Sequence, residues 1–463
     1  MTFREKYIGD RAFYRRVFAV MAPVLIQQVI TNFVSLLDNL MVGQIGTEPM
    51  SGVAIVNQLL FVFNLCIFGG MAGPGIFTAQ FYGREDPDGV RHTFRAKWYV
   101  GVVSTALGLL VLTLGGTKLI SLFLHEGDAG LDLAETLRQG QDYLAVMLWQ
   151  MLPFAAVQVY ASTLRETGET MVPMRAGLIA VGVNLVFNYI LIFGKLGAPV
   201  MGVRGAAIAT VLARVVEFLI VAIWTHRHTE KCEFIRGAYR SVRVPLPLVK
   251  KMAVMGLPLL VNEVLWSAGM TTLNQCYSLR GLEVVSAMNI SSTVSNLFFC
   301  AFFAMGTTVS IVVGQHLGAG RLQQAVDEDR KLIAFAVVLC ACVGVVMALI
   351  SPWIPRLYNT TDVVRRLAEE LLIVTSAMMP FFAFTNACYF TLRSGGKTLI
   401  TFLFDSAFVW GVCIPLAFFL SRYTGMAILP MYILVQSLEL IKCVTGFFLV
   451  KSRRWVNNLV SEI

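Results

Sequence analysis

Charged residues are scarce in this chain of 463 residues. Asp, Glu, Lys and Arg together make up 14% of it, whereas hydrophobic residues make up 57%. Because soluble domains usually carry about a quarter charged residues, the composition excludes an ordinary soluble protein. The apolar runs are long enough to cross a bilayer as helices, which takes about 20 residues each. The sequence therefore predicts an integral membrane protein.

Motifs of nucleotide-driven pumps and of common hydrolases are also missing. The chain has no GxxxxGK[ST] phosphate-binding loop and no GxSxG nucleophile motif, and HEGDA at His125 lacks the second histidine of HExxH. We therefore expect neither an enzyme nor an ATP-driven pump, no cofactor, and no structural metal site. The odd number of cysteines, nine, favours packing residues over a disulfide framework.

Twelve apolar stretches can span a membrane. They cover approximately residues 15–40, 51–76, 94–116, 139–161, 172–194, 203–225, 251–276, 285–314, 332–354, 366–391, 398–420 and 425–450. Lys and Arg gather at the two ends and in the even-numbered loops, which marks these as cytoplasmic. The net charge of +9 then reflects membrane orientation, and we expect no nucleic-acid partner. We expect surface positions for the five histidines (His92, His125, His226, His228 and His316), which fall in loops or at span ends.

The second half of the chain repeats the first. At an offset of 235 positions eight residues recur: Pro23/Pro258, Leu25/Leu260, Val29/Val264, Asn39/Asn274, Gly46/Gly281, Glu48/Glu283, Gln80/Gln315 and Gly83/Gly318. Further along, the offset is 228, for example in Gly168/Gly396. A period this long indicates a duplicated lobe. Since each copy has six spans, both enter the membrane from the same side, and their symmetry axis lies along the membrane normal.

The fold prediction follows directly. We expect an all-α membrane protein of twelve transmembrane helices in two six-helix lobes, related by pseudo-two-fold symmetry along the membrane normal. The first lobe covers residues 1–225, a basic cytoplasmic linker covers 226–250, and the second lobe covers 251–463. Two lobes of this kind are typical of alternating access. Pro23 and Pro258, at equivalent places in the first and seventh spans, are candidate hinges because a proline inside a helix removes a backbone hydrogen bond.

Ionisable residues deep inside the spans mark candidate functional positions, because each costs about 2.5 kcal/mol or more there. Seven lie well within the spans, away from their ends: Asp38, Arg214, Glu217, Glu263, Asp405, Glu439 and Lys442. Four of them form two pairs with a spacing of three residues, so each pair can neutralise itself on one helix face.

The acids Asp38, Glu263 and Asp405 have no such local partner. A desolvated carboxylate can exchange a proton near neutral pH, and with amide or carbonyl oxygens around it can bind a hard cation. We expect these three to couple transport to H+ or Na+, with transient Na+ binding at Asp38 or Glu263. The residue types alone fit either H+ or Na+ as the coupling ion.

Polar residues near these acids extend both candidate sites. Asn184 and Asn188, four apart on the fifth span, share one face, and Thr210 lies on the sixth. For the substrate cavity we expect a set drawn from both halves: Gln28, Asn32, Asn262, Trp266 and Asn386. An acid such as Glu263 beside the indole of Trp266 suits an organic cation.

Five stretches together resemble the multidrug and toxic compound extrusion (MATE) family, and especially its bacterial branch with the DNA-damage-inducible members. They are LLDNLMVGQIG (36–46), NLVFNYILIFG (184–194), GVRGAAIATVLAR (202–214), GLPLLVNEVLWSAGM (256–270) and LRSGGKTLITFLFDSAFVWGVCIP (392–415). The resemblance covers nearly the whole chain. It implies efflux of cationic or amphipathic compounds driven by inward movement of H+ or Na+, and a place in the bacterial cytoplasmic membrane.

The resemblance also implies a coupling set in the first lobe. Asp38, Asn184 and Thr210 match it, but Asn188 stands where archaeal members have an Asp. Another branch of the family pairs an acid on the seventh span with one on the tenth. Glu263 is similar to the acid on the seventh span. The tenth span has no acid, and its nearest polar residue is Asn386, so we expect Asp405 on the eleventh span to take the role of the missing acid.

We therefore expect an antiporter for small organic cations or amphipathic drugs, embedded in a lipid bilayer as a monomer. The main alternative is a flippase for a lipid-linked or other amphipathic metabolite. A pyrophosphate cargo would require several Arg or Lys residues in the cavity, whereas the unpaired charges here are acidic. A channel or receptor is a third class, and the duplicated lobes argue against it.

Overall fold

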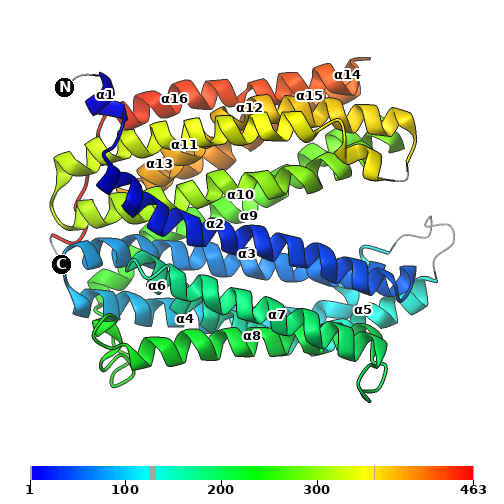
Figure 1. Ribbon diagram of the computed structural model, residues 1–463, viewed down its shortest axis with the longest axis horizontal. Helices are drawn as coiled ribbons and strands as arrows, with labels where there is room; N and C mark the ends of the chain where they lie inside the picture. The colour runs from blue at the N-terminus through cyan, green and yellow to red at the C-terminus, as the bar shows by residue number, and fades with distance from the viewer. Residues whose placement is uncertain (1–2, 125–131, 359, 462–463) are drawn as a thin grey trace. The chain divides into compact units, whose positions relative to one another are not determined.

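The computed structural model describes residues 3–124, 132–358 and 360–461, and all regular secondary structure within these ranges is helical (Figure 1). His125 and its HEGDA motif therefore lie outside the described residues. The helices are α1 (Phe3–Tyr7), α2 (Arg11–Gly43), α3 (Thr47–Gly83), α4 (Pro87–Ser121), α5 (Leu133–Met147), η1 (Leu148–Gln150), α6 (Met151–Glu166), α7 (Met171–Phe193), α8 (Gly202–Arg227), η2 (Glu233–Ile235), α9 (Leu246–Ser278), α10 (Leu282–Gly318), α11 (Leu322–Ile350), η3 (Ile354–Leu357), α12 (Asp362–Ser394), α13 (Thr398–Phe402), η4 (Leu403–Ala407), η5 (Val409–Cys413), α14 (Ile414–Tyr423), α15 (Ile428–Ser437) and α16 (Glu439–Lys451).

The membrane-spanning segments agree with the prediction. Eleven helical segments of the described chain are long and apolar enough to cross a membrane, and they coincide with eleven of the twelve predicted spans. The remaining predicted span, 251–276, lies within α9, which has 33 residues and at 1.5 Å per residue is about 50 Å long. The predicted all-α class is confirmed.

The backbone conformation explains why two glycine pairs recur in the sequence repeat. Gly168 ends the turn after α6 with φ +86°, and Gly396 does the same after α12 with φ +76°. Gly46 and Gly281, which precede α3 and α10, have φ +151° and +124°. Side chains with a Cβ disfavour this region. The repeat therefore preserves the positions at which each lobe turns between its helices.

The described chain divides into two compact units. Unit 1 comprises residues 1–25, 79–86 and 251–463, and unit 2 comprises residues 26–78 and 87–250. In unit 2, α8 packs against α5, α6 and α7, whereas in unit 1, α10, α11 and α12 pack together (Figure 1). The first turns of α2 and the last turns of α3 thus belong with the second half of the chain. The predicted domain limits at residues 225 and 251 stay a prediction.

The buried core of unit 1 includes small side chains. Ala304, Ala325 and Ala336 are fully buried in one cluster with the start of α2. Small residues let helix backbones approach closely, which is how membrane helices gain packing energy without a hydrophobic effect between them.

The basic stretch between the halves is folded onto unit 2. Arg95 of α4 donates to the carbonyl oxygens of Ala238 (2.8 Å), Gly237 (2.9 Å) and Arg243 (3.2 Å). Nearby on α4, Arg91 donates to the carbonyl oxygen of Phe234 at 3.1 Å. These guanidinium groups satisfy backbone carbonyls that no helix pairs, so the segment 226–250 is a structured part of unit 2.

Candidate ion-coupling sites and buried charge clusters

The predicted first-lobe residues meet at one place in unit 2. Asp38 of α2 accepts a hydrogen bond from Asn188 of α7, with 2.6 Å between Asn188 Nδ2 and Asp38 Oδ1. Asn188 Nδ2 also lies 3.1 Å from Asn184 Oδ1, and the Asn184 amide lies 3.3 Å from the Thr210 hydroxyl of α8. Three helices therefore supply one connected polar cluster.

Turning the Asn184 amide exchanges its oxygen contact with Asn188 for a hydrogen bond to Asp38. With its nitrogen turned toward Asp38, it donates to Asp38 Oδ1 at 2.8 Å, and its oxygen accepts from the Thr210 hydroxyl at 3.3 Å. Amide oxygen and nitrogen atoms are assigned from their hydrogen-bond partners. This orientation gives the carboxylate donors from both asparagines, and charge-assisted hydrogen bonds of this kind are stronger than neutral ones.

A second cluster in unit 1 surrounds Asp405. Asn262 Nδ2 donates to Asp405 Oδ2 at 3.1 Å, and the Ser406 hydroxyl donates to the backbone oxygen of Asn262 at 2.8 Å. Asp405 lies in η4, a π-helical segment of the eleventh span. Such segments widen a helix and occur often at functional sites. The predicted neighbours α9 and the eleventh span are therefore linked through Asn262.

Asp405 differs from the prediction because it does have a cationic partner. Lys442 Nζ of α16 lies 3.3 Å from Asp405 Oδ1 and 3.5 Å from Glu439 Oε1. The expected pair of Glu439 with Lys442 thus exists, but it is shared with Asp405 from another helix. The other expected pair, Arg214 with Glu217, is present at 2.7 Å.

The other predicted residues occupy separate positions. Glu263 of α9 is partly buried and within electrostatic range of Arg393 and Asp405. Asn386 of α12 has a buried side-chain oxygen for which the described residues provide no hydrogen-bond donor. Gln28 and Asn32 lie on α2, Trp266 lies on α9, and Pro23 and Pro258 lie inside α2 and α9. Their roles in the cavity and as hinges stay predictions.

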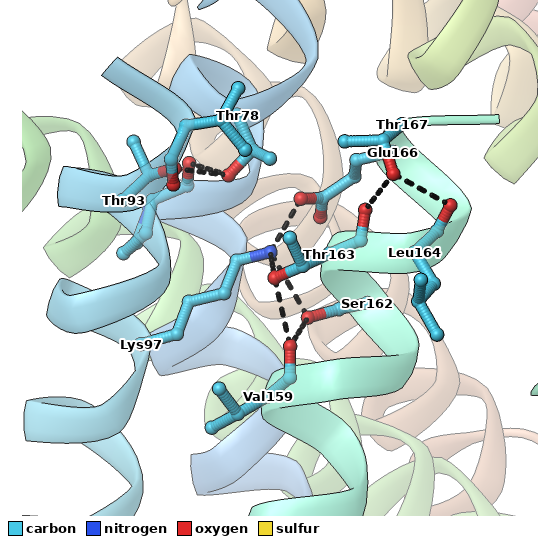
Figure 2. Close-up of polar contacts among 11 residues, drawn as sticks. Thr78, Thr93, Lys97, Val159, Ser162, Thr163, Leu164, Glu166 and Thr167 are labelled. Carbon is cyan, nitrogen blue, oxygen red and sulfur yellow. Dashed lines mark hydrogen bonds and ion pairs between the residues drawn. The ribbon is translucent and has the colours of Figure 1, made fainter. Parts of the chain in front are cut away.

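A fully buried lysine in unit 2 was missed by the sequence reasoning (Figure 2). Lys97 of α4 is 0% exposed, and its ammonium lies 2.5 Å from Glu166 Oε2 and 3.1 Å from the hydroxyl oxygens of Ser162 and Thr163. The predicted span 94–116 contains Lys97, so a charge count inside that span would have found it. Its partner Glu166 ends α6, beyond the predicted span.

A cluster in unit 1 corrects the prediction for one histidine. His316 of α10 is 7% exposed, and its Nε2 lies 3.0 Å from Glu328 Oε2 of α11. Arg16 of α2 donates to Glu328 Oε1 at 2.8 Å. His316 is therefore buried, contrary to the expected surface position, because a carboxylate and the neighbouring helix enclose it.

Side chains that commonly bind metals are dispersed through the described ranges. Residues 3–124, 132–358 and 360–461 contain no group of three or more His, Cys, Asp or Glu side chains arranged to hold a metal ion. The polar atoms that face the Asp38 carboxylate are the amide nitrogens of Asn188 and Asn184, and the Thr210 hydroxyl lies beyond Asn184.

Known proteins resemble this chain along most of its length. A family profile described as MatE matches residues 23–190 and again 258–419, so each match begins at one of the two repeated prolines. The chain is 24% identical over 418 residues to "Probable multidrug resistance protein NorM" of Thermotoga maritima, covering 89% of this chain and 86% of that protein. It is 26% identical over 365 residues to "Multidrug resistance protein MdtK" of Pectobacterium atrosepticum, covering 78% of each.

A solved structure shares the fold. The crystal structure of a mutant of the Vibrio cholerae MATE transporter VcmN superposes with a TM-score of 0.84 at 17% identity, covering 95% of this chain and 97% of that one. The family profile covers more than half of the chain and matches it once in each half, as the duplicated lobes require. The chain belongs to the MatE family of multidrug efflux transporters, and it is a multi-pass membrane protein.

Proposed function

We propose that the protein is a secondary active antiporter that exports cationic or amphipathic organic compounds in exchange for protons or sodium ions by alternating access. The observation that carries the proposal is the cluster of Asp38 with Asn188, Asn184 and Thr210. Within the described part of the chain, no Lys or Arg forms an ion pair with Asp38. Its charge is therefore open to compensation by a mobile ion.

The chemistry of this cluster suits reversible ion binding. A carboxylate held by amide donors at 2.6 Å and 2.8 Å is kept in one orientation. When an amide rotates, it turns its oxygen instead of its nitrogen toward the site, and that oxygen can then bind Na+. An ion that arrives at Asp38 changes the charge available to hold an organic cation, which couples the two movements.

The second-lobe cluster contributes differently in this proposal. Lys442 already compensates Asp405 and Glu439, so Asp405 does not need a mobile ion. We assign coupling first to Asp38 and second to Glu263, with Asp405 as a residue that positions Asn262 beside Glu263. Asp405 remains a candidate coupling residue only when Lys442 moves away.

The sign of the unpaired charges supports a cationic cargo. Asp38 and Glu263 are acidic, whereas the Arg214 guanidinium lies 2.7 Å from Glu217 and is therefore not free for a pyrophosphate. A flippase for a lipid-linked metabolite stays the alternative function. We further propose a monomer in the bacterial cytoplasmic membrane with both termini in the cytoplasm, since Lys and Arg mark the cytoplasmic side of a membrane protein.

Purified protein in liposomes tests the proposal. An imposed proton or sodium gradient should move ethidium, and the double variant Asp38→Asn with Glu263→Gln should lose this transport. Asp362→Asn is a matched control, because the Asp362 side chain is 96% exposed. Unchanged transport in the double variant would refute the assigned roles. Movement of ethidium with neither gradient required would favour facilitated flipping.

A further inference from the structure

The segment that follows the last span folds back onto unit 1. We call residues 455–460 the C-terminal segment. Trp455 and Val460 are both 0% exposed, and the indole of Trp455 donates to the backbone oxygen of Val450 at 2.9 Å. Its backbone oxygen comes so close to Gly395 that a Cβ there would lie 1.7 Å away. The segment is therefore packed as tightly as a core element.

One glutamine of α3 ties this segment to unit 1. Gln80 is 0% exposed. Its Nε2 donates to the backbone oxygens of Ser394 (3.0 Å) and Asn457 (3.3 Å), and its Oε1 accepts from the backbone N–H of Leu459 at 2.8 Å. One turn later, Arg84 donates to the backbone oxygen of Val460. The end of α3 is thus bound both to α12 and to the C-terminal segment.

The two repeated glycines form a reciprocal crossing beside this glutamine. A Cβ on Gly83 of α3 would lie 1.9 Å from the backbone oxygen of Gln315, and a Cβ on Gly318 of α10 would lie 1.8 Å from that of Gln80. Each glycine therefore lets the backbone of a glutamine from the other half of the repeat come close: Gln315 at Gly83, and Gln80 at Gly318. Asn458 of the C-terminal segment closes the crossing by donating to the backbone oxygen of Gly318 at 3.2 Å.

We propose that the C-terminal segment is a latch that holds the end of α3 against α10 and α12. α3 begins in unit 2 and ends in unit 1, so its last turns are where the first half of the chain is fixed to the second. Separating the end of α3 from α10 and α12 requires the three Gln80 hydrogen bonds and the glycine crossing to break. The latch goes beyond the proposed antiport and acts whichever ion drives it.

Hydrogen–deuterium exchange of the purified full-length protein in lipid nanodiscs tests the latch. Gln80→Ala removes three hydrogen bonds, and the loss of each one changes the equilibrium constant for local opening by a factor of about five. We expect amide exchange in residues 79–86 and 314–318 to accelerate by at least about tenfold. A chain that ends at Arg454 should show the same pattern, because it lacks the segment itself. Gln44→Ala is the matched control, since Gln44 is an exposed glutamine at the end of α2.

Two results would overturn the proposal. One is an amide exchange rate at residues 79–86 of the Gln80→Ala variant that stays within about twofold of the rate in the parent protein. The other is faster exchange spread evenly over all helices, which would report a general loss of stability. Should the shortened chain not fold, Gln80→Ala alone decides, because it removes only one side-chain amide.

Discussion

Replacing Lys97 tests how much the buried cluster of Figure 2 stabilises unit 2. Lys97→Met keeps the apolar stem and removes the ammonium. It leaves the Glu166 carboxylate, 18% exposed, without the cation 2.5 Å away. Breaking a buried ion pair on one side costs about 3–5 kcal/mol, and we expect that loss in the free energy of unfolding.

A double-mutant cycle makes the prediction specific. Lys97→Met together with Glu166→Gln removes both charges of the pair, so we expect the double variant to lose less than the sum of the two single losses. Unfolding in mixed micelles with increasing sodium dodecyl sulfate, followed by tryptophan fluorescence, measures the free energies. The reasoning is refuted if Lys97→Met unfolds within about 1 kcal/mol of the parent, or if the two single losses simply add.

Two further predictions concern packing and the linker. Gly83→Ala and Gly318→Ala should each lower the unfolding temperature strongly or prevent folding, because a Cβ would lie 1.9 Å and 1.8 Å, respectively, from a backbone oxygen. By contrast Gly182→Ala, with open space around it, should leave that temperature unchanged in a thermal unfolding scan. Burial raises the pKa of the Cys232 thiol to about 12, which lowers its thiolate fraction at pH 8 and should make maleimide labelling slow. Arg95→Ala removes three hydrogen bonds to the linker and should accelerate that labelling at least about fivefold, as measured by peptide mass spectrometry; an unchanged rate would contradict a docked linker.

The sequence predicted the elements of the fold because their signals are local. Long apolar runs indicate spans whatever their neighbours, and a repeat shows duplication without any knowledge of packing. Asn184 and Asn188 were predicted to share a face because helical spacing alone places them there, and they do meet Asp38. The sequence repeat showed that Gly83 and Gly318 are identical residues at equivalent positions. Why both are glycines, namely the close backbone crossing, depends on which helices are in contact.

Lateral contacts between helices could not be predicted in the same way. Asp405 and Lys442 lie on different helices, so their 3.3 Å contact has no signature in sequence spacing. Lys97 lies near the start of the predicted span 94–116, whereas its partners Thr163 and Glu166 follow the fourth predicted span, so sequence spacing does not bring them together. His316 looked exposed at a helix end until Glu328 of α11 enclosed it. Each difference arises from a neighbouring helix that the chain alone does not identify.

The most direct test of the account is whether a substrate and an ion compete at Asp38. In weakly buffered solution, ethidium added to the purified protein should release protons, or it should displace bound radioactive sodium if Na+ is the coupling ion. Asp38→Asn should abolish this displacement, and Asp362→Asn should preserve it. Ethidium binding that releases neither ion, or release that persists unchanged in Asp38→Asn, would contradict ion-coupled antiport through Asp38.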